Sequence, residues 1–161
     1  MKPHHHADEV SLVEFPETRV AALEHRGDPL HLGDSIRKFI EWRRQNRLPP
    51  RVSATFNIAY DDPEGVVPAD FRMDLCAATE NPIVPNSQGV VAKVIPGGRC
   101  ALLRHLGSED TLGDTIRYLY SHWLPRSGAE PRDFPLFLQR VVFFPEVPDH
   151  EAITDVFLPL K

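Results

Sequence analysis

The side chains that could do chemistry in this chain include several at paired positions. His25 and His105 end two similar apolar runs, and Glu24 and Arg104 come directly before them. A histidine pair could hold a metal ion or act as acid and base, but two histidines at equivalent sites favour a repeated structural hydrogen bond. Glu24 and Arg104 carry opposite charges, which predicts an ion pair between the equivalent positions, at the surface and of little energetic weight.

Asp74 interrupts the run Phe71–Leu75, which is otherwise apolar on one face. Two interpretations of this carboxylate stay open. It is either an acid inside a binding pocket or the partner of Arg72, or of another strand's arginine, on the solvent face. The second half of the chain shows no acidic counterpart for it.

Aromatic side chains on the predicted helices and strands could line a groove for an apolar ligand. Each of them could equally fill the core. Trp42 and Trp123 are the strongest candidates, because they lie near corresponding ends of two predicted helices and Trp is enriched at binding surfaces. The candidate ligand-binding residues are Trp42, Phe56, Tyr60, Asp74, Tyr120, Trp123, Phe137 and Arg140.

Residues with catalytic or metal-binding spacing do not stand out. There is no arrangement of nucleophile, base and acid, no Gly-x-Ser-x-Gly sequence and no metal-ligand spacing. Cys76 and Cys100 lie in apolar runs, which indicates two buried thiols in a reducing compartment and predicts a cytoplasmic protein. We therefore expect no catalytic residues, no metal site and no cofactor.

The elements that position these residues occur twice. Residues 15–37 align with residues 95–117 at a constant offset of 80, and 11 of the 23 aligned pairs are identical. Ordinary residue frequencies would give about one or two. Two copies are too few for a solenoid, so the chain is predicted to hold two related units that pack about a pseudo-two-fold axis.

Each copy is predicted to contain a strand, a helix and two further strands. The first strands are residues 20–26 and 100–106, each ending at a glycine, and apolar residues at helical spacing follow from Leu32 and Leu112. Pro49 and Pro125 are expected to end the helices. The remaining strands are predicted at 52–60, 70–77, 136–144 and 153–160, and short opening strands at 11–14 and 90–94.

The first long strand of each copy separates two faces. All identities fall on one parity, which includes Ala21, Leu23 and His25, and residues of one parity share a face of a sheet. We call this the shared face and expect it to pack near the helix. The other parity has changed completely between the copies, and we call it the divergent face. It carries Val20, Ala22, Glu24 and Arg26 in the first copy and Cys100, Leu102, Arg104 and Leu106 in the second.

Length and composition indicate the class of protein to which the chain belongs. The chain has 161 residues, 42% of them hydrophobic, which is typical of one globular domain without a membrane span. The net charge of -5, from 18 basic and 23 acidic residues, argues against direct contact with nucleic acid. We expect residues 1–9 to be a linker or tag-like segment, because His4, His5 and His6 are a terminal triplet. Residues 10–161 are expected to form a single domain, with unit one at 10–80, a connector at 81–88 and unit two at 89–161.

Three stretches of sequence resemble a known family. They are Arg-Val-Ala-x-Leu-x-His-x-Gly at 19–27, Tyr60–Pro63 with Phe71–Asp74, and the closing run 153–160. In this order they resemble the GyrI-like small-molecule-binding domain, the effector-binding domain of many AraC-type and MerR-type bacterial transcription regulators. The resemblance covers about residues 10–160 and implies an α+β fold. Two pseudo-two-fold-related β-α-β-β units would form a twisted antiparallel sheet with two main helices and a central groove.

The resemblance also implies apolar, often cationic or aromatic ligands, held by aromatic side chains and, in several members, by a buried glutamate. Where many members have Pro-x-Phe-Glu-x-Tyr, this chain has Leu138 at the glutamate position and Arg140 at the tyrosine position. A neutral or even anionic ligand is therefore more plausible than a cation held by that acid.

The expected function is an effector-binding or drug-sensing domain that takes an apolar aromatic small molecule between the two repeats. Residues 1–9 could not encode a DNA-binding fold, so we expect a DNA-binding domain elsewhere in a longer or separate polypeptide. Two alternatives stay open. Some members of the family hydrolyse electrophilic natural products, and others inhibit a partner such as gyrase.

Overall fold

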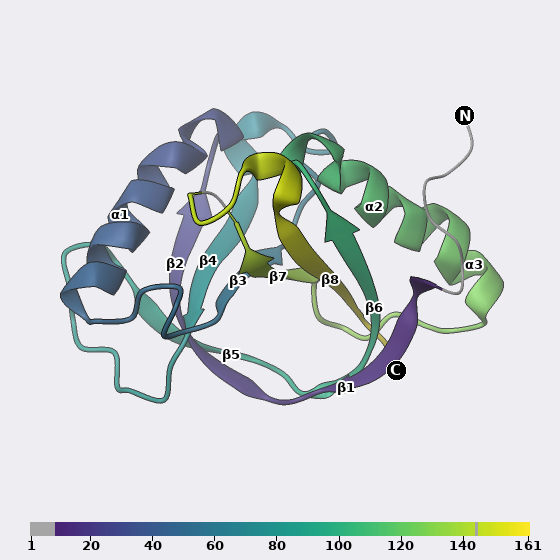
Figure 1. Cartoon of the computed structure of the whole chain (residues 1–161), viewed down its shortest axis with the longest axis horizontal. Coiled ribbons are helices and arrows are strands. Elements are labelled where there is room, and N and C mark those ends of the chain that lie inside the picture. Colours follow the sequence, from purple (N-terminus) through teal and green to yellow (C-terminus); the bar gives the residue numbers. More distant parts are fainter. Residues whose placement is uncertain (1–8, 144) are drawn as a thin grey trace. The chain divides into compact units, whose positions relative to one another are not determined.

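The computed structural model describes residues 9–143 and 145–161, so the His4–His6 triplet and Phe144 lie outside the described residues. The chain divides into two compact units (Figure 1). One comprises Glu17–Ile95 and is called the central unit below. The other joins Met1–Pro16 to Pro96–Lys161 and is called the terminal unit.

The central unit holds four antiparallel strands and one long helix. Its strands follow the order β3-β4-β2-β5, so β4 and β2 lie inside and β5 at one edge. Helix α1 covers one face of β2 and β4 (Figure 1). The elements in chain order are β2 (Thr18–Arg26), α1 (Leu32–Gln45), β3 (Thr55–Ala59), β4 (Arg72–Ala78) and β5 (Val91–Ile95).

The terminal unit repeats this plan with the strand order β1-β6-β8-β7, again antiparallel. A bulge between Arg140 and Val142 shifts the register of β7 on β8. The elements are β1 (Ser11–Phe15), β6 (Gly98–Leu106), α2 (Leu112–Tyr118), the π-helical turn η5 (Leu119–Trp123), α3 (Leu124–Ser127), β7 (Phe137–Val142) and β8 (Ile153–Pro159).

The predicted α+β class and the order strand, helix, strand, strand are confirmed in both copies. The opening strands are present too, but each pairs with the long strand of the other repeat copy: β1 with β6, and β5 with β2. The compact units therefore exchange their opening strands relative to the order of the repeat.

The shared face packs against the helix in the central unit, as its parity predicted. Ala21 and Leu23 of β2 belong to one buried cluster with Phe39 and Trp42 of α1. The rings of Phe39 and Trp42 stack with their centroids 6.0 Å apart. Burial of these side chains holds α1 on the sheet.

The helical spacing predicted α1 correctly, but it included two residues that are not buried. Ile36 and Ile40 are exposed, whereas Phe39, Trp42 and Arg43 are buried. Arg43 donates to the carbonyl oxygens of Leu48 and Ser53 at 2.7 and 2.8 Å and to Thr55 Oγ1 at 2.7 Å. Desolvation lowers its pKa to about 10. This side chain ties the end of α1 to the start of β3, so a cation takes a core position.

Both histidines on the shared face make the predicted structural hydrogen bond. His25 Nδ1 lies 2.7 Å from Ser35 Oγ, and His105 Nδ1 lies 2.7 Å from Thr115 Oγ1. Each Nε2 faces a backbone carbonyl in the following turn, Gly27 at 3.0 Å and Ser108 at 2.9 Å. A carbonyl oxygen only accepts, so Nε2 carries a proton, and in the neutral ring Nδ1 is then the acceptor that faces the hydroxyl.

The turns beside these histidines require glycine. Gly27 and Gly107 have φ values of 121° and 108°, which side chains with a Cβ rarely adopt. Their amides donate to Phe71 and Ala152, at 2.8 Å in both cases. The strand, the turn and the start of the helix are thus held identically in the two units, which explains why these positions match in the sequence.

Pro125 does not end the second helix, contrary to the sequence prediction. The helix passes through η5 into α3 and ends at Gly128, whose φ is 73°. Proline fits the first turn of α3 because its missing N–H is not needed there. The π turn holds one residue more than an α turn, so Trp123 corresponds to Trp42 at an offset of 81 rather than 80.

Candidate functional site

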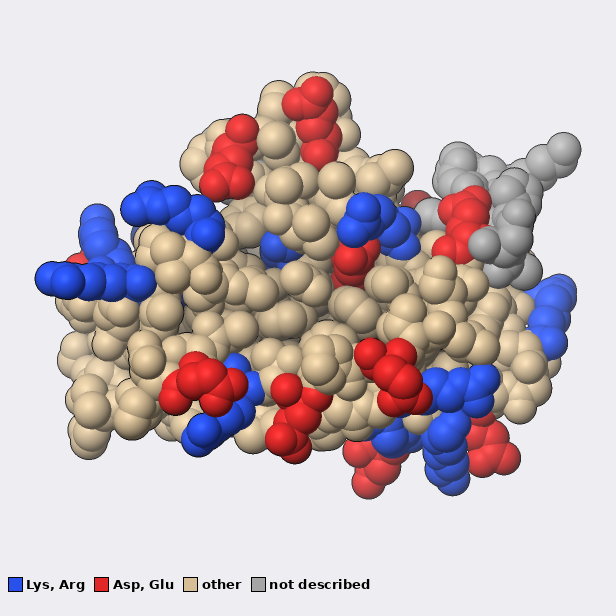
Figure 2. All heavy atoms as spheres, turned by 60° about the horizontal axis from the view of Figure 1, so that its bottom comes forward, with Lys and Arg blue, Asp and Glu red and all other residues tan. Residues whose placement is uncertain are grey.

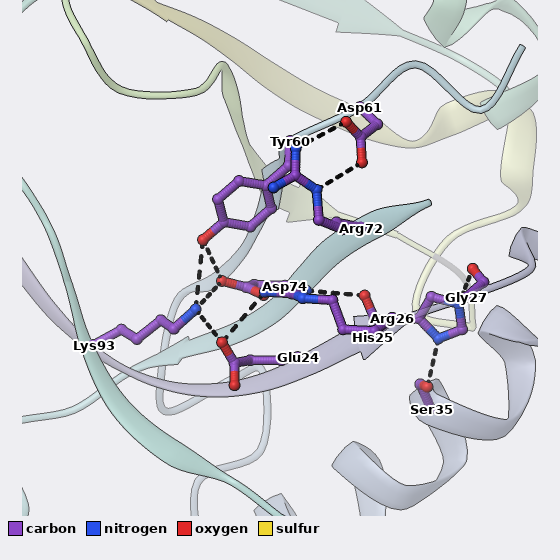
Figure 3. Close-up of polar contacts among 10 residues, drawn as sticks. All are labelled: Glu24, His25, Arg26, Gly27, Ser35, Tyr60, Asp61, Arg72, Asp74 and Lys93. Carbon is purple, nitrogen blue, oxygen red and sulfur yellow. Dashed lines mark hydrogen bonds and ion pairs between the residues drawn. The ribbon is translucent and has the colours of Figure 1, made fainter. Parts of the chain in front are cut away.

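A buried carboxylate stands at the centre of the divergent face in the central unit. Asp74 lies on β4, directly opposite Glu24 of β2, and its exposed fraction is 0%. Lys93 of β5 lies opposite Val20 and therefore shares this face. We call the residues around this carboxylate the Asp74 cluster: Glu24, Arg26, Tyr60, Asp61, Arg72, Asp74 and Lys93 (Figure 3).

Three donors satisfy the Asp74 carboxylate. Arg26 Nη1 donates to Oδ1 at 3.0 Å, and Tyr60 Oη and Lys93 Nζ each donate to Oδ2 at 2.7 Å. A carboxylate out of water is stable only with such compensation. Asp74 is therefore the partner of an arginine on a neighbouring strand, but it is buried and not on the solvent face.

Lys93 and Arg26 also bind a second acid, the more exposed Glu24. Lys93 Nζ lies 2.6 Å from Glu24 Oε2, and Arg26 Nη2 lies 3.2 Å from the same oxygen. Figure 3 shows Lys93 reaching from β5 to the point where Glu24, Asp74 and the Tyr60 hydroxyl converge. The two acids lie opposite each other across the β2–β4 pair, and the lysine bridges them.

The Tyr60 ring has cations around it. The guanidinium carbons of Arg26 and Arg72 lie 5.2 and 5.4 Å from the ring centroid, and Lys93 Nζ lies 5.7 Å from it. These distances are within the range of cation–π attraction. Asp61 holds Arg72 in place through two bonds of 3.0 and 3.1 Å.

Protonation in the cluster follows from its contacts. Desolvation and the hydrogen bond to Asp74 raise the pKa of Tyr60 above its ordinary 10.0, so at neutral pH the phenol is a neutral donor. Desolvation alone would lower the pKa of Lys93, but its hydrogen bonds to Asp74 and Glu24 outweigh this and raise the pKa. The hydrogen bond from Arg72 lowers the pKa of Asp61.

The cluster as a whole is electrically balanced. Its three carboxylates are Glu24, Asp61 and Asp74, and its three cations are Arg26, Arg72 and Lys93. An incoming charged group would have to displace one of these partners, because each of the six takes part in an ion pair within the cluster.

The terminal unit has an acid at the same place, which corrects the prediction that Asp74 lacks a counterpart. Arg104 lies opposite Asp155 in the β6–β8 pair, as Glu24 lies opposite Asp74. The Arg104 guanidinium binds Asp155 through bonds of 2.8 and 3.1 Å. Glu24 and Arg104 thus pair within their own units. The counterpart of Lys93 on β1 is Val13, at the offset of 80.

Three aromatic side chains also lie on the divergent face of the terminal unit. The ring centroids of Phe137 and Phe157 lie 5.0 Å apart and stack, and Phe15 meets both edge-on at 4.8 and 5.1 Å. All three are buried. The divergent face thus carries the Asp74 cluster in one unit, and the aromatic cluster together with the Arg104–Asp155 pair in the other.

The structure brings only some of the predicted site residues together. Tyr60 donates a hydrogen bond to Asp74. By contrast, Trp42 and Phe56 are buried in the central unit, and Phe137 is buried in the aromatic cluster. Tyr120, with an exposed fraction of 44%, lies in the π turn with Trp123.

The other predicted polar residue, Arg140, has an ion pair with Glu109 and donates to Thr154 Oγ1 at 3.4 Å. The sequence interpretation included an arginine of another strand as a partner of Asp74, without naming Arg26, and it missed Lys93. The sequence signal that could have identified Lys93 is the difference between the opening strands, where Lys93 is equivalent to Val13.

The described residues contain neither a cluster of metal-ligating side chains nor a membrane-spanning helix. Within these parts of the chain, no three His, Cys, Asp or Glu residues gather as a metal site requires. Across residues 9–143 and 145–161, no helix is long and apolar enough to cross a membrane. On the face shown in Figure 2, Lys and Arg alternate with Asp and Glu, so this face lacks the clustered positive charge that phosphates attract.

Comparison with known proteins agrees with this architecture. Residues 8–161 match the model of the GyrI-like small-molecule-binding domain, and the chain belongs to this family. It is thus a small-molecule-binding domain of the kind found in transcription regulators.

One curated protein and two solved structures resemble this chain. The chain is 38% identical over 153 residues to the probable transcriptional regulator YgiV of Escherichia coli strain K12, covering 94% of this chain and 96% of the relative. The crystal structure of the EcmrR C-terminal domain matches with a TM-score of 0.75 at 16% identity, covering 94% of this chain and 96% of that one. In the EcmrR–DNA complex, the match covers 57% of the longer EcmrR chain.

Proposed function

We propose that this protein is an effector-binding module that takes an uncharged, apolar aromatic small molecule and serves transcription regulation. The family and the regulator relatives support the class. The divergent faces, with their aromatic rings and hydrogen-bonding groups, supply the residue types that such a ligand needs. The predicted groove between the repeats remains part of the proposal.

The observation that carries the ligand class is the balanced charge of the Asp74 cluster. A cationic ligand needs a carboxylate whose charge is not already compensated, and Asp74 accepts from Arg26, Tyr60 and Lys93. Leu138 is a buried apolar residue at the position where the family resemblance implies a glutamate. An uncharged ligand leaves every ion pair of the cluster intact.

The proposed regulatory role requires a DNA-binding domain as a partner. The part of the longer EcmrR chain that this protein matches is 57% of its length, and that structure is a complex with DNA. By analogy, we propose that a DNA-binding domain elsewhere, in a longer or separate polypeptide, binds the DNA. The chain would then report the presence of its ligand to that domain.

A thermal-shift experiment with matched probes tests the ligand class. The probes are 2-naphthalenemethanol, 2-naphthalenemethylammonium and 2-naphthoate, which share one ring system and differ in charge. A ligand that binds only the native state raises the melting temperature. We expect the alcohol to stabilise the protein most. A larger shift with the ammonium probe would contradict the proposed ligand class.

A further inference from the structure

The surroundings of Lys93 are those of a bound primary ammonium ion. Its Nζ lies 2.6 Å from Glu24 Oε2 and 2.7 Å from Asp74 Oδ2. The Tyr60 hydroxyl is 3.4 Å away, and the Tyr60 ring centroid is 5.7 Å away. Two carboxylates and an aromatic face are the groups that recognise an alkylammonium ion, through charge-assisted hydrogen bonds and cation–π attraction.

We propose that Lys93 is the specificity-determining residue of this site: its own ammonium group occupies an alkylammonium site and thereby excludes cationic ligands. This inference rests on the proposed small-molecule-binding function and deepens it. A tethered amine has a high effective concentration at the site, so a free amine competes poorly. The ligand that the site prefers is then an uncharged one.

The internal repeat supports this role for Lys93. In the terminal unit the residue opposite Asp155 is Arg104, which binds that acid directly, and the edge strand carries Val13 where β5 carries Lys93. In the central unit the residue opposite Asp74 is Glu24. Two facing acids leave an extra negative charge, and the edge strand supplies the lysine that neutralises it. The lysine and the facing acid occur together in one unit and are both replaced in the other.

Removal of the lysine side chain would leave an unfilled acceptor site. Without Lys93 the cluster has three carboxylates against Arg26 and Arg72, and Glu24 and Asp74 share Arg26 as their remaining cation. The Lys93 side chain is 25% exposed, so the space it leaves opens to solvent. A small amine can therefore enter from outside.

Chemical rescue of Lys93→Ala tests the proposal. The alanine keeps Cβ, and n-propylammonium replaces the atoms that are lost. We expect Lys93→Ala to melt below the wild type and to regain about 2 °C or more when n-propylammonium replaces sodium at equal ionic strength. The wild type and Lys161→Ala, which removes the exposed lysine beside Glu130, should not respond.

The same variants separate failure of this inference from failure of the proposed function. Equal responses of Lys93→Ala and Lys161→Ala to n-propylammonium would overturn the role of Lys93. That readout is stability alone, so it does not depend on whether the wild type binds the naphthyl alcohol. Absence of naphthyl binding with intact rescue would instead contradict the proposed ligand class.

A second variant keeps the test decisive if Lys93→Ala does not fold. Glu24→Gln with Lys93→Ala removes one charge of each sign, and it leaves Asp74 Oδ2 without its ammonium partner while Arg26 still binds Oδ1. We expect it to respond to n-propylammonium through Asp74, less than Lys93→Ala does where both fold. Addition of Asp74→Asn should abolish the response. Failure of Glu24→Gln/Lys93→Ala to respond, or an equal response after Asp74→Asn, would contradict the ammonium site.

Discussion

The two units share one scaffold and differ in what they place on its divergent face. Both hold a histidine against a helix hydroxyl and a glycine turn against the neighbouring strand. In the central unit the other face carries the Asp74 cluster, whereas the terminal unit carries stacked phenylalanines and one Arg104–Asp155 pair. The contrast shows that the scaffold keeps its fold when the charge of a single cross-strand partner is reversed, provided that the edge strand compensates.

The largest expected effect comes from removing the central acid. Asp74→Ala leaves Arg26 and Lys93 without their buried partner, and we expect a loss of about 3 to 5 kcal/mol in the free energy of unfolding. Asp155→Ala should cost about 1 to 2 kcal/mol, because Arg104 is half exposed and can be hydrated. Urea unfolding of both variants measures the difference. Equal losses would contradict the distinction between the units.

Unlike the two acids, the two histidines should contribute equally to the free energy of unfolding. His25→Ala and His105→Ala each remove the partner of a helix hydroxyl and of a turn carbonyl, and each should cost about 1 to 3 kcal/mol. The same urea experiment compares them. A strong dependence on only one histidine would mean that the shared face does not meet the same structural demand in both units.

Exchange of two residues of the central unit for their terminal-unit counterparts tests whether the two positions are coupled. Glu24→Arg with Lys93→Val gives the central unit the residue types that the terminal unit has at the equivalent positions, Arg104 and Val13. We expect each single change to destabilise and the pair to recover about 1 to 2 kcal/mol relative to the sum of the two. A double-mutant cycle by urea unfolding measures this coupling. Additive effects would show that the two positions are independent.

The smallest expected effect is the alkaline pH dependence of stability that Tyr60 contributes in the central unit. The pKa of Tyr60 is raised, so the folded state retains the phenolic proton more strongly than the unfolded chain. This contribution to stability is fully present below the ordinary pKa of 10.0 and is lost as pH rises through the folded value. Melting temperatures measured across alkaline pH should fall more steeply for wild type than for Tyr60→Phe. Parallel curves would contradict the phenol's role as a donor.

The sequence predicted the elements well because the repeat exposed them. Identities such as His25 with His105 and Gly27 with Gly107 mark contacts that both units make. Parity within the first strand correctly predicted which face packs on α1. Helical spacing alone could not define the buried face of α1, since it also included the exposed Ile36.

The candidate site was predictable only in part. Tyr60 and Asp74 stand out by residue type, but Lys93 lies 19 positions from Asp74 and 33 from Tyr60 and reaches them only because β5 pairs with β2. Asp155 was missed as the counterpart of Asp74 because the offset changes from 80 to 81 at the π turn. Strand pairing and one inserted residue are properties of the fold that local sequence patterns do not reveal.

The central claim is that Lys93 occupies the cation site of the central unit and sets the preference for uncharged ligands. The most direct test compares the melting-temperature shifts that 2-naphthalenemethanol and 2-naphthalenemethylammonium produce in wild type and in Lys93→Ala. We expect the alcohol to stabilise wild type more and the ammonium compound to stabilise Lys93→Ala more. The same order of the two probes in both proteins would contradict it.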